Sequence, residues 1–183
     1  MRLFVAVNFD EATKSRLLAV QNRIKAQSAR GNFPGRENLH LTLVFIGEAA
    51  AALVPEIVSI VKNSLVPLPG AFTVNLSRTG CFRRGGKELW WVGPALDGSA
   101  DPGIGTLAAI RQRMGDGLDA AGIHHDRRPF KAHITLGREI RPLAPIAPVE
   151  QRLCVPVTRV SLMRSERIRG ALAYTELFGQ ELA

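Results

Sequence analysis

The segment NLHLTLVF, residues 38–45, alternates polar and apolar side chains in a way that decides the fold around it. His40 and Thr42 alternate with Leu41 and Leu43, and residues two apart in a β-strand point to the same face of a sheet. The segment therefore predicts a strand that buries its leucines and presents an imidazole and a hydroxyl on its other face.

A second segment, KAHITLGR at residues 131–138, repeats this frame far downstream. His133 and Thr135 alternate there with Ile134 and Leu136. One such tetrapeptide is a weak signal, because His and Thr are common on solvated strand faces. The chain has only four histidines, however, and two of them stand in this frame, which favours a functional role.

The order of predicted elements also repeats. A long helix, a glycine-containing turn and a strand bearing His-x-Thr-Leu occur over residues 10–43 and again over 104–136. The pattern predicts an α+β fold with two similar lobes and antiparallel sheets, in a single domain over residues 1–183. The predicted helices are 10–29, 50–65 and 104–122, and the predicted strands are 2–9, 39–47, 71–80, 88–93, 130–139 and a closing hairpin of 155–166 with 172–179.

Two imidazoles and two hydroxyls around one point suit chemistry at a phosphate. Histidine titrates near neutral pH, so that one ring can accept a proton from water while the other donates one to a leaving oxygen. The hydroxyls of Thr42 and Thr135 can donate hydrogen bonds to phosphoryl oxygens. Arg138 is the nearest candidate for a bidentate contact to the substrate. It lies an odd number of residues from His133, so a bulge after Gly137 is needed to turn it to the same face.

Metal chemistry is the rival prediction. Neither histidine segment carries the carboxylates or the HExxH spacing of a metal site, and HHD at residues 124–126 is expected to be a solvated turn. The segment RRGGK at 83–87 lacks the spacing of a phosphate-binding loop and is expected to be a hairpin turn. We therefore expect no metal site and no cofactor.

The aromatic residues divide into expected core and one candidate for stacking. Trp90 and Trp91 must face opposite ways in a strand, so one belongs to the core and the other can stack a nucleobase. No role is expected for Tyr174, the only tyrosine. Core positions are expected for Phe33, Phe45, Phe82 and Phe130.

The net charge of +8 favours polyanionic partners such as nucleic acid. The basic residues form clusters, including 83–87 and 127–131, which could line an anion-binding cleft if the fold gathers them. Cys81 and Cys154 have no metal-type spacing and indicate free thiols in a reducing compartment. No apolar run is long enough to span a membrane or to form a signal peptide, so we expect a cytoplasmic location.

Together, these segments resemble the two-histidine phosphoesterase superfamily, and within it the RNA 2′,3′-cyclic phosphodiesterase family, also described as 2′-5′ RNA ligase-like. ENLHLTLVFIG and FKAHITLGR match its paired motifs, and RLFVAV and LAYTEL are similar to its opening and closing strands. The sequence departs from the family at Ala132, where proline is frequent, and this departure puts substrate details in doubt more than chemistry.

The resemblance implies a bilobal fold with a central cleft and metal-independent hydrolysis of a terminal 2′,3′-cyclic phosphate to a 2′-phosphate. The same cleft chemistry also serves 2′-5′ RNA ligase or phosphodiesterase activity. His40 would be the proton donor to the leaving O3′ and His133 the proton acceptor, roles that the residues alone leave open. Partners would be RNA ends or nucleotides with a cyclic phosphate, with no membrane, no obligate protein partner and a monomeric state. The alternative is a nucleotide- or RNA-binding module that uses the cleft without catalysis.

Overall fold

Strands dominate the computed structural model, which describes residues 1–67, 70–95, 101–148 and 150–182. Within these residues, nine antiparallel strands form one sheet in the order β7-β4-β5-β6-β3-β1-β8-β9, and β2 pairs with β6 off this path. The predicted α+β class is confirmed. The strands are β1 Arg2–Asn8, β2 Ser28–Asn32, β3 His40–Glu48, β4 Phe72–Arg84, β5 Lys87–Gly93, β6 Ile134–Pro142, β7 Glu150–Val157, β8 Arg159–Ile168 and β9 Ala171–Glu181. The helices are α1 Glu11–Ala26, α2 Val54–Ser64 and α3 Pro102–Ala120.

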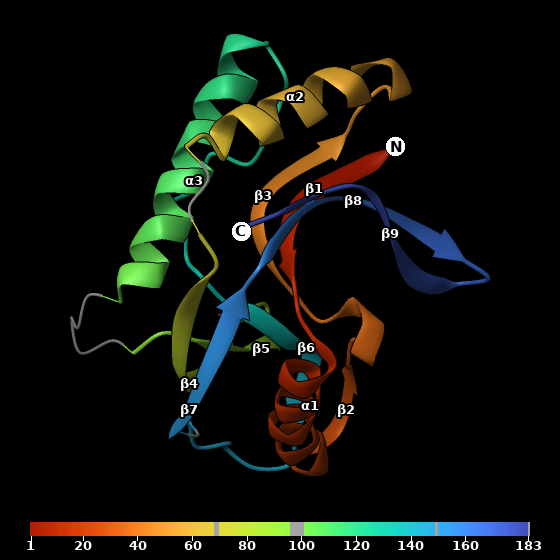
Figure 1. Ribbon diagram of the computed structural model, residues 1–183. Coiled ribbons are helices and arrows are strands. Elements are labelled where there is room, and N and C mark those ends of the chain that lie inside the picture. Colours follow the sequence, from red (N-terminus) through yellow and green to blue (C-terminus); the bar gives the residue numbers. More distant parts are fainter. Residues whose placement is uncertain (68–69, 96–100, 149, 183) are drawn as a thin grey trace.

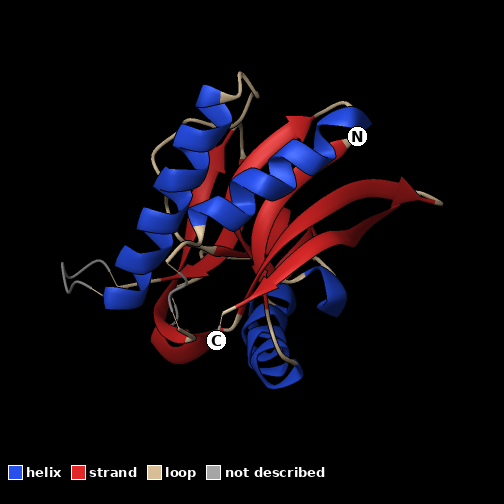
Figure 2. Cartoon of the chain, turned by 45° about the horizontal axis from the view of Figure 1, so that its top comes forward, coloured by secondary structure: helices blue, strands red, loops and turns tan. Residues whose placement is uncertain are grey.

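Side-chain caps set where two of the helices begin. The Asp10 carboxylate accepts a hydrogen bond from the Thr13 N–H at the start of α1, and the Asp101 carboxylate accepts one from the Ile104 N–H at the start of α3. Each bond satisfies an amide that has no partner inside the helix. The helices cover different parts of the sheet, because α2 and α3 lie together near β3 whereas α1 lies apart, beside β2 and β6 (Figures 1 and 2).

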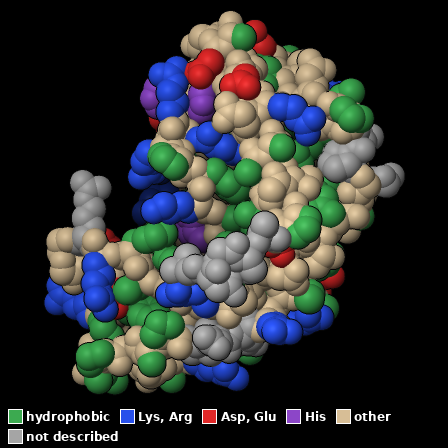
Figure 3. All heavy atoms as spheres, turned by 90° about the vertical axis from the view of Figure 1, so that its left-hand side faces the viewer, with side chains coloured by type: hydrophobic (Ala, Val, Ile, Leu, Met, Phe, Trp, Pro, Cys, Tyr) green, Lys and Arg blue, Asp and Glu red, His purple; other side chains and the backbone are tan. Residues whose placement is uncertain are grey.

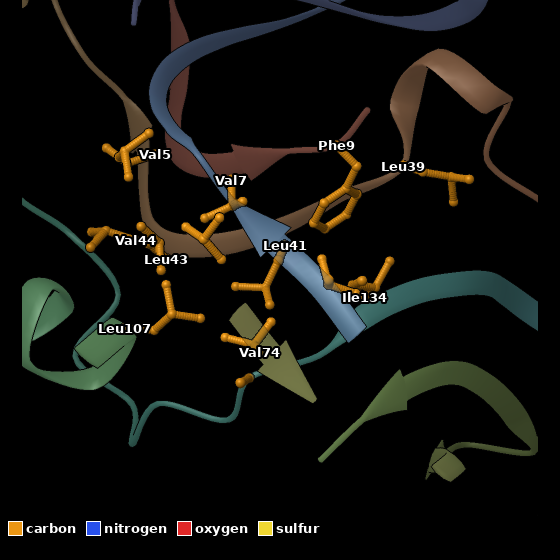
Figure 4. Close-up of a cluster of buried hydrophobic side chains, with 14 of the residues drawn as sticks. Val5, Val7, Phe9, Leu39, Leu41, Leu43, Val44, Val74, Leu107 and Ile134 are labelled. Atoms are coloured by element: carbon orange, nitrogen blue, oxygen red, sulfur yellow. The ribbon is translucent and has the colours of Figure 1, made fainter. Parts of the chain in front are cut away.

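The sheet has two halves that meet between β6 and β3. Strands β7, β4, β5 and β6 form one half, and β3, β1, β8 and β9 form the other (Figure 1). The register at the junction pairs Leu41 with Ile134. Both side chains are 0% exposed and point into the core beside Val7 and Val74 (Figure 4). The predicted alternation is confirmed, since Leu41, Leu43, Ile134 and Leu136 are all buried.

Two strands were not expected. β2 has the polar sequence SARGN, and its backbone bonds to the edge of β6 make it a strand where side-chain preference predicts a helix end. β7 was expected to form the start of the closing hairpin, but it pairs with β4 as a separate edge strand. The closing hairpin itself consists of β8 and β9, as expected.

We expect Leu41→Ala to lower the free energy of unfolding by about 2–5 kcal/mol, because it opens a cavity at the junction of the two halves. Chemical denaturation would measure the change. The matched control is Leu143→Ala, since Leu143 is 71% exposed and its truncation is expected to change stability by about 0.5 kcal/mol or less. Equal stability of the two variants would contradict a packed junction at Leu41.

Candidate active site

The two imidazole rings are held in the same way. His40 Nδ1 lies 2.8 Å from the Asn38 carbonyl oxygen, and His133 Nδ1 lies 2.6 Å from the Lys131 carbonyl oxygen. A carbonyl only accepts, so each Nδ1 carries the hydrogen and donates it to the residue two positions earlier. Both rings therefore present Nε2 as the atom that can exchange a proton. His40 Nε2 is also 3.1 Å from Thr42 Oγ1.

The register places the four motif side chains on one face. In an antiparallel pair with Leu41 opposite Ile134, the next positions on either side place His40 opposite Thr135 and Thr42 opposite His133. The two histidines are then diagonal neighbours, a separation of roughly 7–8 Å between Cα atoms in regular sheets. A phosphate group placed between them would have a histidine and a threonine on each side.

Arg138 belongs to the same face, through a break in β6. Consecutive residues Trp91 and Trp90 pair with Thr135 and Gly137, so one residue of β6 is extra at this point. Arg138 is exposed although Leu136 and Ile140, two residues to either side, are buried, which shows that the alternation is interrupted. The expected bulge is present, and the register breaks both before and after Gly137.

Arg138 acts electrostatically on both histidines. Burial lowers the pKa of His40 below its ordinary value, and the positive charges of Arg138 and a protonated His133 lower it further, against the hydrogen bond to Asn38, which raises it. Burial also lowers the pKa of His133, and Arg138 adds to this effect, whereas the bond to Lys131 opposes it. Each ring is therefore poised to be neutral until an anion enters and offsets the guanidinium charge.

Aromatic side chains flank each histidine, a feature that sequence reasoning missed. The Phe4 ring lies 4.9 Å and the Tyr174 ring 5.1 Å from the His40 ring, measured between centroids. The Phe82 ring lies 5.6 Å from the His133 ring, edge to face. The prediction of a core position for Phe82 was wrong, because its side chain is 39% exposed. Trp90 is the core tryptophan, and Trp91 faces the site, as its pairing with Thr135 shows.

Most residues of the predicted basic clusters 83–87 and 127–131 are not gathered in the site, although Lys131 lies beside Phe82. Arg83 and Lys87 pair with Glu88 and Glu139, and Arg127 and Arg128 pair with Asp119 and Asp126, mostly as surface ion pairs. The RRGGK segment is a hairpin turn, as expected, since Gly85 and Gly86 form its two-residue loop with positive φ. Within the described residues, the Arg138 guanidinium, in contrast, makes no ion pair or side-chain hydrogen bond, and its charge acts on His40, His133 and Tyr174.

The HHD segment does not form the solvated turn that was expected. His124 is exposed, but the side chain of His125 is buried, with Nδ1 3.6 Å from an Asp119 oxygen. Asp126 is paired with Arg128. Packing of this loop against the end of α3 explains the burial, because Gly115 leaves room beside the His125 ring. Among the described residues, no cluster of three or more His, Cys, Asp or Glu side chains is arranged to hold a metal ion.

One face of the molecule is hollowed and basic. Figure 3 shows Lys and Arg side chains along a hollow, with a His side chain beside them.

Cys81 and Cys154 are both free thiols, in β4 and β7. None of the helices in the described part of the chain is long and apolar enough to cross a membrane.

Known proteins share both the sequence pattern and the fold. The family model of the 2′-5′ RNA ligase superfamily matches residues 12–169. The RNA 2′,3′-cyclic phosphodiesterase of Thermus thermophilus is 31% identical over 178 residues, covering 97% of this chain and 88% of the relative. The Escherichia coli K12 protein of the same name is 30% identical over 141 residues, covering 77% and 74%.

Solved structures of other proteins have the same fold. The crystal structure of TT0787 from Thermus thermophilus superimposes with a TM-score of 0.81 at 29% identity, covering 100% of this chain and 98% of that one. The crystal structure of E. coli LigT complexed with 3′-AMP superimposes with a TM-score of 0.78, covering 99% and 96%. At 23% identity, the second likeness shows the fold alone.

Proposed function

Because the chain belongs to the 2′-5′ RNA ligase superfamily, we propose that it is an RNA 2′,3′-cyclic phosphodiesterase that hydrolyses a terminal 2′,3′-cyclic phosphate to a 2′-phosphate. The relatives that carry this activity in their names support the reaction. The observation that carries the mechanism is the pair of imidazoles, each held through Nδ1 by a backbone carbonyl and each next to a threonine on one face of the β3–β6 junction.

The reaction divides between the two rings. His133 Nε2 accepts a proton from water as the water oxygen bonds to phosphorus. The bond from phosphorus to O3′ breaks, and His40 Nε2–H donates its proton to O3′. After the reaction, His133 is protonated and His40 is neutral, and proton exchange with solvent restores the starting protonation of both rings. No metal ion is needed in this scheme, because the two histidines carry out both proton transfers.

The threonines and Arg138 hold the phosphate. In neutral His40, Nε2 accepts the hydrogen bond of the Thr42 hydroxyl, because Nδ1 carries the ring hydrogen. When Nε2 is protonated, it donates instead, and the Thr42 hydrogen is released to donate to a phosphoryl oxygen. Thr135 occupies the equivalent position on the other strand. The guanidinium of Arg138 adds a permanent positive charge where negative charge develops in the transition state.

The substrates and the lack of a required protein partner are proposed from the sequence. RNA ends or nucleotides bearing a cyclic phosphate are the proposed substrates, and no protein partner is required for the two-histidine site. Because each half of the sheet supplies one histidine and both halves share one core cluster, we propose that residues 1–183 act as one domain. A cytoplasmic location and a monomeric state stay predictions.

A pH profile tests the function. With EDTA present, kcat/KM for the hydrolysis of a nucleoside 2′,3′-cyclic phosphate is expected to have a bell-shaped dependence on pH, because one ring must be neutral and the other protonated. Both histidine pKa values lie below the ordinary 6.5 in the free protein, so the maximum is expected on the acidic side of pH 6.5. The pH profile of kcat is expected to lie at higher pH than that of kcat/KM, since the bound anionic substrate favours the imidazolium form.

Three results would contradict the proposal. Loss of activity in EDTA would indicate a metal-dependent hydrolase. A profile with one limb would show that a single group titrates. Nucleotide binding without turnover of any cyclic phosphate would favour the non-catalytic binding module.

A further inference from the structure

The β4–β5 hairpin places an exposed aromatic ring beside the active-site residue His133. Phe82 is among the few large apolar side chains with more than a third of their surface exposed, at 39%. Its ring meets the His133 ring at 86°, with 5.6 Å between centroids. The ring therefore contacts the imidazole that is proposed to act on the phosphate.

The ring is supported from beneath. The Trp91 ring lies 5.3 Å from that of Phe82 at an interplanar angle of 34°, which is a tilted stack. Trp91 itself lies flat on the sheet because Gly80 and Gly93 leave space for it, and a Cβ at either glycine would overlap its six-membered ring. Trp91 Nε1 has no hydrogen-bond partner in the described part of the chain, so packing alone holds the indole.

The platform of Phe82 on Trp91 is also in line with the motif side chains. Gly80 pairs with Trp91, and Trp91 pairs with Thr135, so these three positions form one row across β4, β5 and β6. The Lys131 Nζ lies 5.9 Å from the Phe82 ring centroid, at the outer limit of a cation–π contact. This lysine is exposed, so its charge would stay near the phosphates of an RNA whose base stacked on Phe82.

The opposite side of the site is already occupied by its own contacts. Phe4 is buried, and its ring and that of Tyr174 pack against each other and against His40. Tyr174 is only partly exposed, so the more exposed aromatic ring among those that contact the two histidines is Phe82, on the His133 side.

We propose that Phe82, supported by Trp91, stacks the nucleobase of the nucleotide that carries the cyclic phosphate. Stacking accepts any base, because every base has a π-face, so the platform selects for a nucleotide and discriminates little between sequences. This inference rests on the proposed function and adds to it the group that recognises the base.

The test measures the contribution of the base and that of the phosphate to binding separately. For Phe82→Ala, we expect KM for adenosine 2′,3′-cyclic phosphate and Kd for adenosine 2′-phosphate to rise about 5- to 150-fold, the range for removing one base–aromatic stack. Kd for inorganic phosphate and kcat/KM for the base-free methyl riboside 2,3-cyclic phosphate are expected to change much less, because neither has a base to stack. Phe82→Leu should behave like Phe82→Ala, and Phe82→Trp should retain wild-type affinity.

Controls keep the two proposals apart. Leu143→Ala removes an exposed apolar side chain in the connection between β6 and β7 and is expected to change none of these constants. Thermal unfolding of each variant checks that the fold is kept. An unchanged Kd for adenosine 2′-phosphate in Phe82→Ala would overturn the inference, as would equal losses for the nucleotide and inorganic phosphate. Failure of the wild type to hydrolyse any cyclic phosphate would instead count against the proposed function, while the Kd comparison would still decide the role of Phe82.

Discussion

Replacing either His40 or His133 with alanine is expected to lower kcat on a nucleoside 2′,3′-cyclic phosphate by about 10²- to 10⁴-fold, the usual contribution of a positioned acid or base. KM is expected to change far less, because the threonines and Arg138, which we propose to hold the phosphate, are kept. The double variant should lose little more than the worse single variant, since the two rings act on one transition state. Initial rates at saturating substrate, with EDTA present, measure the effect.

The matched control is His124→Ala, which removes an exposed imidazole in the loop after α3. It is expected to keep wild-type kcat. Undiminished activity in both His40→Ala and His133→Ala would contradict the mechanism. Their pH profiles also separate the two roles. If His40 is the proton donor, as proposed, His40→Ala should keep only the acidic limb due to His133, and His133→Ala only the alkaline limb. The reverse result would exchange the two assignments.

The faces of the two motif strands could be predicted from the sequence. Period-2 alternation is a local property, so it was enough to assign Leu41 and Ile134 to the core and Thr42 and Thr135 to the open face. The closeness of the two strands could not be derived in the same way. Their pairing joins residues far apart in the chain, and its register depends on how the two halves of the sheet pack. The repeated His-x-Thr-Leu frame nevertheless made the closeness of the two strands a reasonable prediction.

Interrupted alternation limits what a sequence shows at Arg138. A regular strand would bury this side chain between Leu136 and Ile140. The breaks in register on either side of Gly137 arise from the pairing of β6 with β5 and β2, including a positive φ at Glu139. The need to turn Arg138 towards His133 predicts a bulge after Gly137, but the second break in register, before Gly137, could be found only from the structure.

The aromatic residues show a second limit. Phenylalanine is more often buried than exposed, so a core position was the reasonable expectation for Phe82. The two-residue turn at Gly85 and Gly86 pairs its strand, β4, with β5, which lies beside β6, and Trp91 of β5 packs against the Phe82 ring. The sequence indicates no role for Tyr174, although the β8–β9 hairpin brings it against the His40 ring. Both contacts come from strand pairing over long distances in the chain.

The second large effect is expected at Arg138. Arg138→Gln should lower kcat/KM about 10- to 150-fold, the range for losing a hydrogen bond to a charged group. Arg138→Lys should recover only part of this loss, because an ammonium keeps the charge but not the two parallel bonds of a guanidinium.

The same variant has a readout that needs no substrate. A positive charge beside an imidazole disfavours the imidazolium form, so Arg138 lowers the pKa of both His40 and His133. Its removal is therefore expected to raise both pKa values towards the ordinary value and to shift both limbs of the kcat/KM profile to higher pH. NMR titration of the imidazole Hε1 signals in the free protein measures the two pKa values directly.

Arg127→Gln is the matched control for charge. Arg127 is exposed and paired with Asp119, so its loss is expected to leave the His40 and His133 titrations unchanged. If Arg138→Gln also left both titrations unchanged, the guanidinium could not face the two rings. If the pKa values rose while kcat/KM stayed the same, Arg138 would tune the histidines without holding the phosphate. A rise in both pKa values together with the loss of kcat/KM requires one guanidinium that reaches both rings and the substrate.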